Sequence, residues 1–286
     1  MTRLVSSSVR PFAFVTLAVA SLLAACEEIP AAKAPVTQGA DTAAVEAKKV
    51  AILQRMCDGG DGMACADLGL RYVQGNGVWQ DGSKAIDLYE RACTLGTGRG
   101  CTFLGFAYER GRGVAQDYAK AKDLYAKGCD AQVGDACTSL GTFYQLGIAT
   151  DRDEGKAASL FEKACSAGEP VGCNKLGALY REGKGVSSNP KKAVELFERA
   201  CMSGNGYACV SAGRSYQGGE GVPVKMDLAA RLYETGCKTD SRAGCGELAR
   251  LYEKGLGVAK SQEKANELYA RACEKESSWC SGQAAK

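Results

Sequence analysis

The sequence predicts an all-α fold, a solenoid of αα-hairpins, from two series of cysteines and one recurring apolar motif. The first series recurs every 36 residues, at Cys57, Cys93, Cys129, Cys165, Cys201, Cys237 and Cys273. The second series follows it eight residues later, at Cys65, Cys101, Cys137, Cys173, Cys209 and Cys245. A fixed period of this length is typical of stacked helical hairpins, because one hairpin cannot bury its own apolar face. Six repeats fit between Cys57 and Cys273.

The N-terminus resembles a bacterial export signal. Arg3 and Arg10 give it a charged start, and the apolar run from Phe12 to Ala25 is too short to span a bilayer comfortably. Residues 23–26 read Leu-Ala-Ala-Cys, which resembles a lipobox. We therefore expect residues 1–25 to be a signal peptide that is removed and Cys26 to be lipidated. An ordinary signal peptide followed by an incidental cysteine is the alternative.

The segment that follows the expected lipidation site predicts how the protein is placed in the cell. Residues 26–43 show little apolar periodicity and are expected to form a flexible tether. Glu27 stands directly after the cysteine, where aspartate would favour retention in the inner membrane. We therefore expect an exported protein anchored in the outer membrane and facing the periplasm. The solenoid is expected over residues 44–280, with a C-terminal tail at 281–286.

Each repeat is expected to begin with a first helix marked by Cys-x-x-Leu-Gly-x-x-Tyr, as at Cys65, Leu68, Gly69 and Tyr72. Offsets 0, 3, 4 and 7 lie along one side of an α-helix, so these residues form a buried stripe. The recurrent glycine allows another helix to approach closely. A Gly-x-Gly-Val segment then ends the helix with glycines at positive φ. It does not continue into the glycine pattern of a phosphate-binding loop.

A second helix is expected to open at a capping position, which is Asp81, Asp117, Asp153, Asn189, Lys225 or Ser261 in the six repeats. Five of these six side chains can accept hydrogen bonds from the exposed amides of a helix, and Lys225 cannot. An apolar series such as Ala85, Leu88 and Tyr89 follows, and the helix runs to the next cysteine of the first series. Residues 45–56 resemble the end of such a second helix, so the solenoid is expected to start with an unpaired one.

The composition excludes several kinds of chemistry. The 286 residues include no histidine, which excludes a Ser-His-Asp triad, a Cys-His dyad and a histidine-ligated metal within this chain. The formal net charge of +3 falls to about +1 when Arg3 and Arg10 are removed, so there is no general reason to expect a nucleic-acid partner. We expect no cofactor.

Export to an oxidising compartment predicts that the cysteines form disulfides. Removal of Cys26 from the 15 cysteines leaves an even number. A turn between a second helix and the following first helix can bring their cysteines within bridging range. The predicted pairs are Cys57–Cys65, Cys93–Cys101, Cys129–Cys137, Cys165–Cys173, Cys201–Cys209, Cys237–Cys245 and Cys273–Cys280. Zinc or iron–sulfur binding is the competing interpretation, but the chain lacks Cys-x2-Cys clusters and we expect no metal.

Together, the Leu-Gly-x-x-Tyr, Gly-x-Gly-Val and Ala-x-x-Leu-Tyr/Phe motifs and the paired cysteines resemble the Sel1-like repeat, a relative of the tetratricopeptide repeat. The closest match is the cysteine-rich, Helicobacter-type branch, and it covers roughly residues 45–280. The resemblance implies a right-handed superhelix that serves as a protein- or peptide-binding scaffold. Three repeats depart from the pattern: residues 147–150 read Gly-Ile-Ala-Thr, Ala212 replaces the leucine, and Ala249 replaces the glycine.

Some members of that branch have been described as penicillin-binding proteins or weak β-lactamases, which is the alternative function. A serine β-lactamase needs a serine with a lysine three residues later and further polar motifs. Ser188 with Lys191 and Ser261 with Lys264 match the first requirement, but Ser-Asp-Asn and Lys-Thr-Gly are absent. Both serines stand at the start of second helices, where caps are expected, so we expect no catalytic residue. A redox or haem-related role lacks a Cys-x-x-Cys motif.

The register of the first helices predicts a partner-binding surface. With the second-series cysteine as position 0, positions 2, 5 and 9 face away from the buried stripe. Apolar candidates there are Leu70, Phe103, Phe106 and Leu146, and basic candidates are Arg110, Lys175, Arg214, Arg250 and Lys254. We expect a groove with an apolar anchor in repeats one to three and a basic end, suited to an extended peptide or an acidic envelope polymer. The competing interpretation is that Phe103 and Phe106 fill gaps between hairpins.

These observations predict a non-catalytic scaffold or adaptor of the cell envelope. It would bind proteins or peptides through the solenoid surface and contact the membrane only through the lipid at Cys26.

Overall fold

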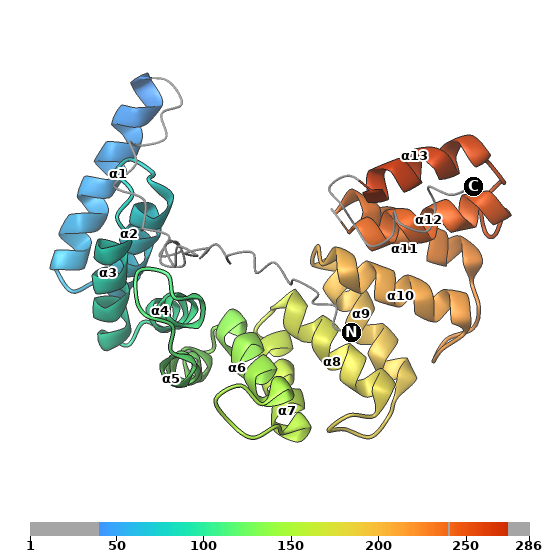
Figure 1. Cartoon of the computed structure of the whole chain (residues 1–286), viewed down its shortest axis with the longest axis horizontal. Coiled ribbons are helices and arrows are strands. Elements are labelled where there is room, and N and C mark those ends of the chain that lie inside the picture. The colour runs from blue at the N-terminus through green and yellow to red at the C-terminus, as the bar shows by residue number, and fades with distance from the viewer. Residues whose placement is uncertain (1–39, 240, 274–286) are drawn as a thin grey trace, which may run out of the picture.

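The helices of the chain stack into an arc (Figure 1) in a computed structural model that describes residues 40–239 and 241–273. All regular secondary structure in these two ranges is helical. The helices are α1 (Ala40–Asp58), α2 (Gly62–Gln74), α3 (Gly82–Thr94), α4 (Gly98–Arg110), α5 (Tyr118–Asp130), α6 (Gly134–Leu146), α7 (Glu154–Ser166), α8 (Pro170–Glu182), α9 (Pro190–Met202), α10 (Gly206–Gly218), α11 (Met226–Lys238), α12 (Arg242–Lys254) and α13 (Gln262–Cys273).

The helices alternate between first and second helices of successive repeats. The hairpins are α2–α3, α4–α5, α6–α7, α8–α9, α10–α11 and α12–α13, and each second helix up to α11 also packs against the first helix of the next repeat. The helix α1 is the second helix predicted at the start of the solenoid, and within the described residues no first helix precedes it. It begins at Ala40, so the predicted tether ends before residue 43. The alanines Ala43, Ala44 and Ala47 favour this extra turn.

The second helices begin at the predicted capping residues. The carboxylates of Asp81, Asp117 and Asp153 each accept a hydrogen bond from the amide three residues later, at 2.8–3.0 Å. Asn189 and Ser261 accept equivalent bonds. Lys225 makes no such bond, so α11 starts without a side-chain cap.

All six first helices in the described residues end at a glycine in the left-handed region, such as Gly75 with φ of 70°. The second glycine of the motif also takes positive φ, and its lack of a side chain lets the loop approach the preceding second helix. A Cβ on Gly185 would lie 2.2 Å from the backbone of Glu154. Repeat three has Ala149 at this position with φ of 52°, which is a strained conformation for a residue with a Cβ.

The recurrent glycine of the first helix packs against an aromatic ring of the second helix. A Cβ on Gly69 would lie 2.6 Å from the Tyr89 ring, and Gly141 meets Phe161 in the same way at 2.7 Å. The predicted role in close helix approach is therefore confirmed. The rings of Tyr125, Phe161 and Tyr233 at this position are fully buried and form the centre of each repeat's core.

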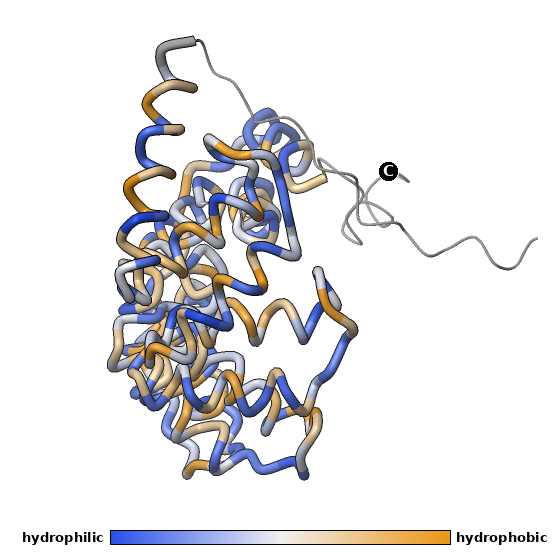
Figure 2. The backbone as a smooth tube through the Cα atoms, turned by 90° about the vertical axis from the view of Figure 1, so that its left-hand side faces the viewer, coloured by the Kyte–Doolittle hydropathy of each residue, from blue (hydrophilic) through white to orange (hydrophobic). Residues whose placement is uncertain are grey.

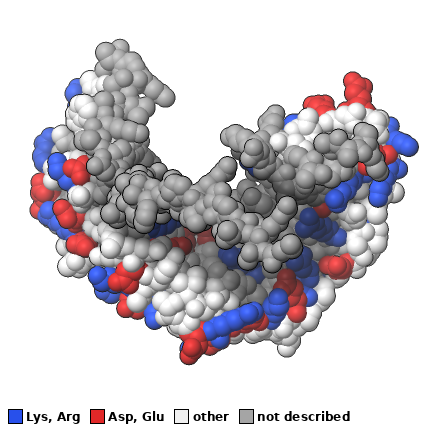
Figure 3. Space-filling view, in the orientation of Figure 1, with Lys and Arg blue, Asp and Glu red and all other residues white. Residues whose placement is uncertain are grey.

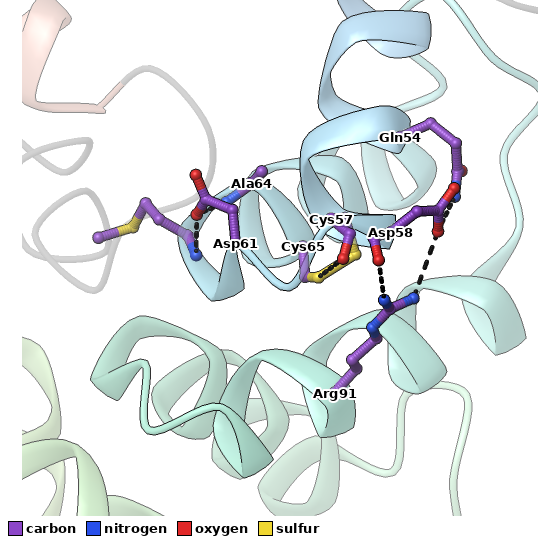
Figure 4. Close-up of a disulfide and its surroundings, with 8 residues drawn as sticks. Gln54, Cys57, Asp58, Asp61, Ala64, Cys65 and Arg91 are labelled. Atoms are coloured by element: carbon purple, nitrogen blue, oxygen red, sulfur yellow. Dashed lines mark hydrogen bonds and ion pairs between the residues drawn. A yellow bond between two sulfur atoms is a disulfide. The ribbon is translucent and has the colours of Figure 1, made fainter.

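Six disulfides link successive repeats, in six of the seven pairs that the sequence predicts. They join Cys57–Cys65, Cys93–Cys101, Cys129–Cys137, Cys165–Cys173, Cys201–Cys209 and Cys237–Cys245, with Cα atoms 4.5–4.7 Å apart. Figure 4 shows the first bridge, where Arg91 of α3 also reaches back to Asp58 at the end of α1. Each bridge closes a loop of about nine residues, which stabilises by about 2.5 kcal/mol on a chain-entropy estimate.

Several predictions concern residues outside the described part of the chain. They are the signal peptide at 1–25, the lipidation of Cys26, most of the tether, the tail at 281–286 and the pairing of Cys273 with Cys280. In the described part, every helix falls short of the combination of length and hydropathy that a bilayer crossing requires. The predicted all-α, disulfide-linked solenoid of six repeats is confirmed.

Candidate binding surface

The first helices lie on the inner side of the arc. In Figure 1, α4 and α6 lie nearer its centre than α5 and α7. Consecutive first helices touch directly at α2–α4, α6–α8, α8–α10 and α10–α12, whereas consecutive second helices make at most marginal contact within the described residues. A curved stack brings its inner elements closest together, so positions 2, 5 and 9 of the first helices belong to the inner face.

Phe103 of α4 is half-buried rather than freely exposed on this face. Its ring packs against two buried clusters, one around Cys65 and one around Tyr89. The ring centroids of Phe103 and Tyr89 are 5.2 Å apart. The guanidinium of Arg99 lies 5.5 Å from the Phe103 centroid and forms an ion pair with Asp67 of the previous repeat at 3.2 Å. At repeats one and two, the inner face therefore presents the Phe103 ring, which is covered by the guanidinium of Arg99 in its ion pair with Asp67.

Phe106 repeats this arrangement one turn further along α4. It is half-buried and contacts the buried ring of Tyr125 edge-on, with centroids 5.4 Å apart. Arg110 lies over Phe106 at 6.0 Å. Tyr125 in turn contacts Phe143 of α6 at 5.5 Å. The interpretation that Phe103 and Phe106 fill gaps between hairpins therefore explains the edge of each ring that packs against a tyrosine. The arginines Arg99 and Arg110 lie over these rings.

The other two apolar candidates are placed differently. Leu146 stands at the C-terminal end of α6 with 63% of its surface exposed. Leu70 is half-buried and lines a cavity between α1 and α2. The four apolar candidates therefore do not form one continuous exposed patch: Leu146 is an open contact point, and Leu70 belongs to a separate hollow.

Apart from Arg110 on α4, the basic candidates lie on α8, α10 and α12. Figure 3 shows lysine and arginine side chains on the inner side of this part of the arc. Lys175 is half-buried and lies 5.5 Å from the Phe161 centroid, and burial lowers its pKa. Lys254 at the end of α12 is exposed. Arg214 and Arg250 are also exposed, and both bind the carboxylate of Glu247.

Glu247 belongs to this candidate surface but is not among the residues that the sequence predicts for it. Only 7% of it is exposed, and Arg214 reaches it from the previous repeat at 2.8 Å while Arg250 reaches it from the next turn at 3.1 Å. Glu247 occupies position 2 of α12, which the sequence already assigns to the inner face. Arg250 follows it by three residues, a spacing at which opposite charges on a helix can pair, and this was the signal available in the sequence. Two guanidinium groups share one carboxylate, so this cluster keeps a net positive charge.

The cavity between α1 and α2 has a volume of about 400 Å³. Ile52 and Leu53 of α1 and Leu70 of α2 supply its apolar lining. Glu46 and Arg71 form an ion pair at 2.5 Å beside it, and hydrogen bonds from Arg71 and Lys49 lower the pKa of Glu46.

Of the two serines considered for catalysis, Ser261 caps a helix as expected, whereas Ser188 stands one residue before the actual cap of α9, Asn189. The Ser261 hydroxyl accepts a hydrogen bond from the Lys264 amide as the cap of α13. The Ser188 hydroxyl lies 3.4 Å from the Arg181 carbonyl in the loop before α9. The described residues contain no group of three or more cysteine, aspartate or glutamate side chains placed to hold a metal ion.

Comparison with known proteins places this architecture in a family. Six segments match the Sel1 repeat, at residues 62–97, 98–133, 134–169, 170–205, 206–238 and 243–277. No curated protein matches the chain in sequence.

Solved structures of two bacterial proteins share the fold. A Sel1 repeat protein from Oxalobacter formigenes is 25% identical, with a TM-score of 0.72 over 84% of this chain and 99% of that one. A protective antigen of uropathogenic Escherichia coli with a Sel1-like repeat fold is 29% identical, with a TM-score of 0.71 over 80% of this chain. The aligned region spans 49% of that antigen. Helicobacter pylori cysteine rich protein B is 36% identical over 46% of this chain and 93% of its own, with a TM-score of 0.38.

The six matched segments cover most of the solenoid, and the first five begin at the first residue of a first helix. The chain belongs to the Sel1 repeat family, whose fold typically serves as a scaffold for protein interactions.

Proposed function

We propose that this protein is an exported, lipid-anchored scaffold of the cell envelope that binds protein or peptide partners on its inner face without catalysing a reaction. The observation that carries the proposal is the pair of contrasting surfaces on that face. One is the aromatic strip of Phe103 and Phe106, and the other is the basic cluster around Glu247. Disulfides at every repeat junction in the described part support an oxidising compartment.

The partner best suited to this face is an extended segment with an apolar end and acidic groups. Leu146 and the exposed edges of Phe103 and Phe106 offer apolar contact, and aromatic and arginine side chains are the residues most enriched at binding hot spots. Lys254 and the two arginines that share Glu247 attract carboxylates. An acidic peptide or an acidic envelope polymer has this chemistry.

Charge reversal on the inner face tests the binding proposal. The probe is a fluorescent peptide of ten glutamates with one terminal phenylalanine, titrated into the purified protein at low salt. Arg214→Glu should weaken its binding by about tenfold or more, since it turns an attraction into a repulsion. The matched control is Arg231→Glu on the second helix α11, where an exposed arginine pairs with Asp227. Equal effects of both reversals would contradict the proposal.

The anchoring proposal has its own test. Cys26→Ser should abolish incorporation of labelled fatty acid into the protein, whereas the wild-type protein should carry the label. Undiminished labelling of the Cys26→Ser variant, or absence of label from the wild-type protein, would contradict lipid anchoring.

The serine positions support binding over hydrolysis, because both hydroxyls lie at helix starts as caps or loop contacts. The purified protein should not hydrolyse the chromogenic cephalosporin nitrocefin. Turnover that Ser188→Ala or Ser261→Ala abolishes would establish the alternative, a β-lactamase.

A further inference from the structure

The helix α1 is a second helix without the first helix that accompanies every other second helix in the described part of the chain. Each residue of α1 corresponds to the residue of α3 that stands 36 positions later in the sequence. The matched pairs are Lys48 with Lys84, Ile52 with Leu88, Leu53 with Tyr89, and Met56 with Ala92. The chain therefore shows, one repeat later, what normally packs on this surface.

In α3 this surface is covered by the first helix α2. Tyr89 is 4% exposed and Ala92 is fully buried. In α1 the matching surface is more open. Leu53, the match of Tyr89, is half-buried, and Met56, the match of Ala92, is 45% exposed. Ile52 is 52% exposed, whereas its match Leu88 is half-buried. Repeat proteins usually end in a polar outer face, so an apolar end is a departure that calls for an explanation. Figures 1 and 2 show α1 at one end of the molecule, with hydrophobic segments along its length.

The interior repeats define how a first helix docks on this surface. Its small residue meets the second helix, as Gly69 meets Tyr89, and three residues later its tyrosine lies against a lysine, as Tyr72 lies 5.4 Å from Lys84. The lysine–tyrosine contact recurs at Lys120–Tyr108, Lys156–Tyr144, Lys192–Tyr180 and Lys264–Tyr252, at 4.2–5.3 Å. Lys48 stands at the same register position on α1 and is exposed.

The 400 Å³ cavity lies where the missing helix would pack, between α1 and α2. Its apolar lining of Ile52, Leu53 and Leu70 matches a helix with an apolar face. Its edge differs from the interior of the solenoid: Lys49 and Arg71 stand at the positions that Ala85 and Ala107 occupy one repeat later. These charged groups and their partner Glu46 keep the surface hydrated when it is open, which suits reversible docking.

We propose that the α1 docking face, formed by Lys48, Ile52, Leu53 and Met56 of α1 with Leu70 of α2, binds an amphipathic helix of a partner protein. The docked helix carries glycine or alanine against Leu53 and an aromatic residue three positions later against Lys48. Each first helix in the described part of this chain is already packed in its own hairpin, so the proposal assigns the docked helix to another protein. The α1 docking face is distinct from the aromatic and basic clusters of the inner face. A helix bound there would extend the solenoid by one helix.

A peptide with the sequence of α6 tests the proposal, because residues 134–146 contain Gly141 and Tyr144 at the required spacing. The probe carries Cys137→Ala, capped ends and a fluorophore, and is titrated into the purified mature protein by anisotropy. We expect saturable binding that Ile52→Glu and Lys48→Glu each weaken by about tenfold or more. A peptide with Gly141→Phe should also lose binding, because the bulky residue prevents close approach.

The matched control is Val224→Glu, which adds the same charge at an exposed apolar residue in the loop before α11 and should leave binding unchanged. Thermal denaturation of each variant verifies that the fold is retained. Absence of saturable binding, or equal binding by the Ile52→Glu variant, overturns the proposal. A concentration-dependent dimer, or binding to phosphatidylethanolamine–phosphatidylglycerol vesicles, that Ile52→Glu abolishes would assign the face to a second copy or to the bilayer instead.

Discussion

The two arms of the inner face, an aromatic arm in repeats one to three and a charged arm in repeats five and six, differ in how firmly their side chains are held by the core. In repeat two, Phe103 and Phe106 present the edges of rings whose other edges pack into the core. In repeats five and six, Arg214 and Arg250 extend from the helix surface and converge on Glu247. Changes to the aromatic arm therefore alter stability and recognition together. Changes to the arginines of the charged arm can alter recognition alone.

The largest expected difference between the arms is in the cost of truncation. Phe106→Ser should lower the free energy of unfolding by about 2–3 kcal/mol, because it removes the ring that contacts Tyr125. Leu146→Ser, on the next inner helix and 63% exposed, should change it by less than about 0.5 kcal/mol. Thermal denaturation of both variants measures the difference. Equal, small changes would show that the Phe106 ring is not part of the core.

Within the charged arm, the carboxylate matters more to stability than either arginine. Glu247→Gln should cost about 1–2 kcal/mol, since a nearly buried acceptor of two charged hydrogen bonds loses its charge. Asp227→Asn removes the partner of Arg231 in a pair whose side chains are both 69% exposed, and should cost less than about 0.5 kcal/mol. Urea denaturation compares the two, and similar costs would mean that the Glu247 cluster is an ordinary surface pair.

The arms also differ in how their second helices begin. The helices α3, α5 and α7 have aspartate caps, whereas α11 starts at Lys225 without a side-chain cap. Lys225→Asp should raise stability by about 0.5–1 kcal/mol, and Asp117→Ala should lower it by about 1 kcal/mol. Differential scanning calorimetry would detect both shifts. A neutral Lys225→Asp would indicate that packing alone fixes the start of α11.

The smallest expected effect lies at the junction between the arms, where Glu169 meets Asp135. Burial and the neighbouring Asp135 carboxyl raise the pKa of Glu169. A raised carboxyl pKa favours the protonated form in the folded state, so this site stabilises at acidic pH and the contribution is lost as pH rises through that pKa. Asp135→Asn should therefore raise the melting temperature slightly at pH 7 and leave it nearly unchanged at pH 4. A larger rise in melting temperature at pH 4 than at pH 7 would contradict the raised pKa of Glu169.

Sequence periodicity was sufficient for the fold because every repeat carries the same local signals. The 36-residue spacing placed each cysteine pair at a turn, and the residues at the Asp81 position placed the helix starts. The departure at Ala149 was also visible, although its positive φ was not.

The binding face was less predictable, because a helical wheel describes one helix and not its neighbours. Positions 2 and 5 of α4 point away from that helix's own buried stripe, yet Tyr89 and Tyr125 of the adjacent second helices cover one edge of each phenylalanine. The ion pair between Arg214 and Glu247 likewise spans two repeats. The sequence did predict that α1 is an unpaired second helix, and the described residues place no first helix against its exposed Ile52 and Met56.

The disulfide-linked repeat junction is the central claim, and counting free thiols tests it most directly. The mature protein would be isolated from the envelope in the presence of an alkylating agent, denatured without reductant, and measured by intact mass spectrometry. The account predicts fewer than about one alkylated cysteine per chain, since each junction cysteine is already bonded. A population in which most of the cysteines are alkylated would contradict it.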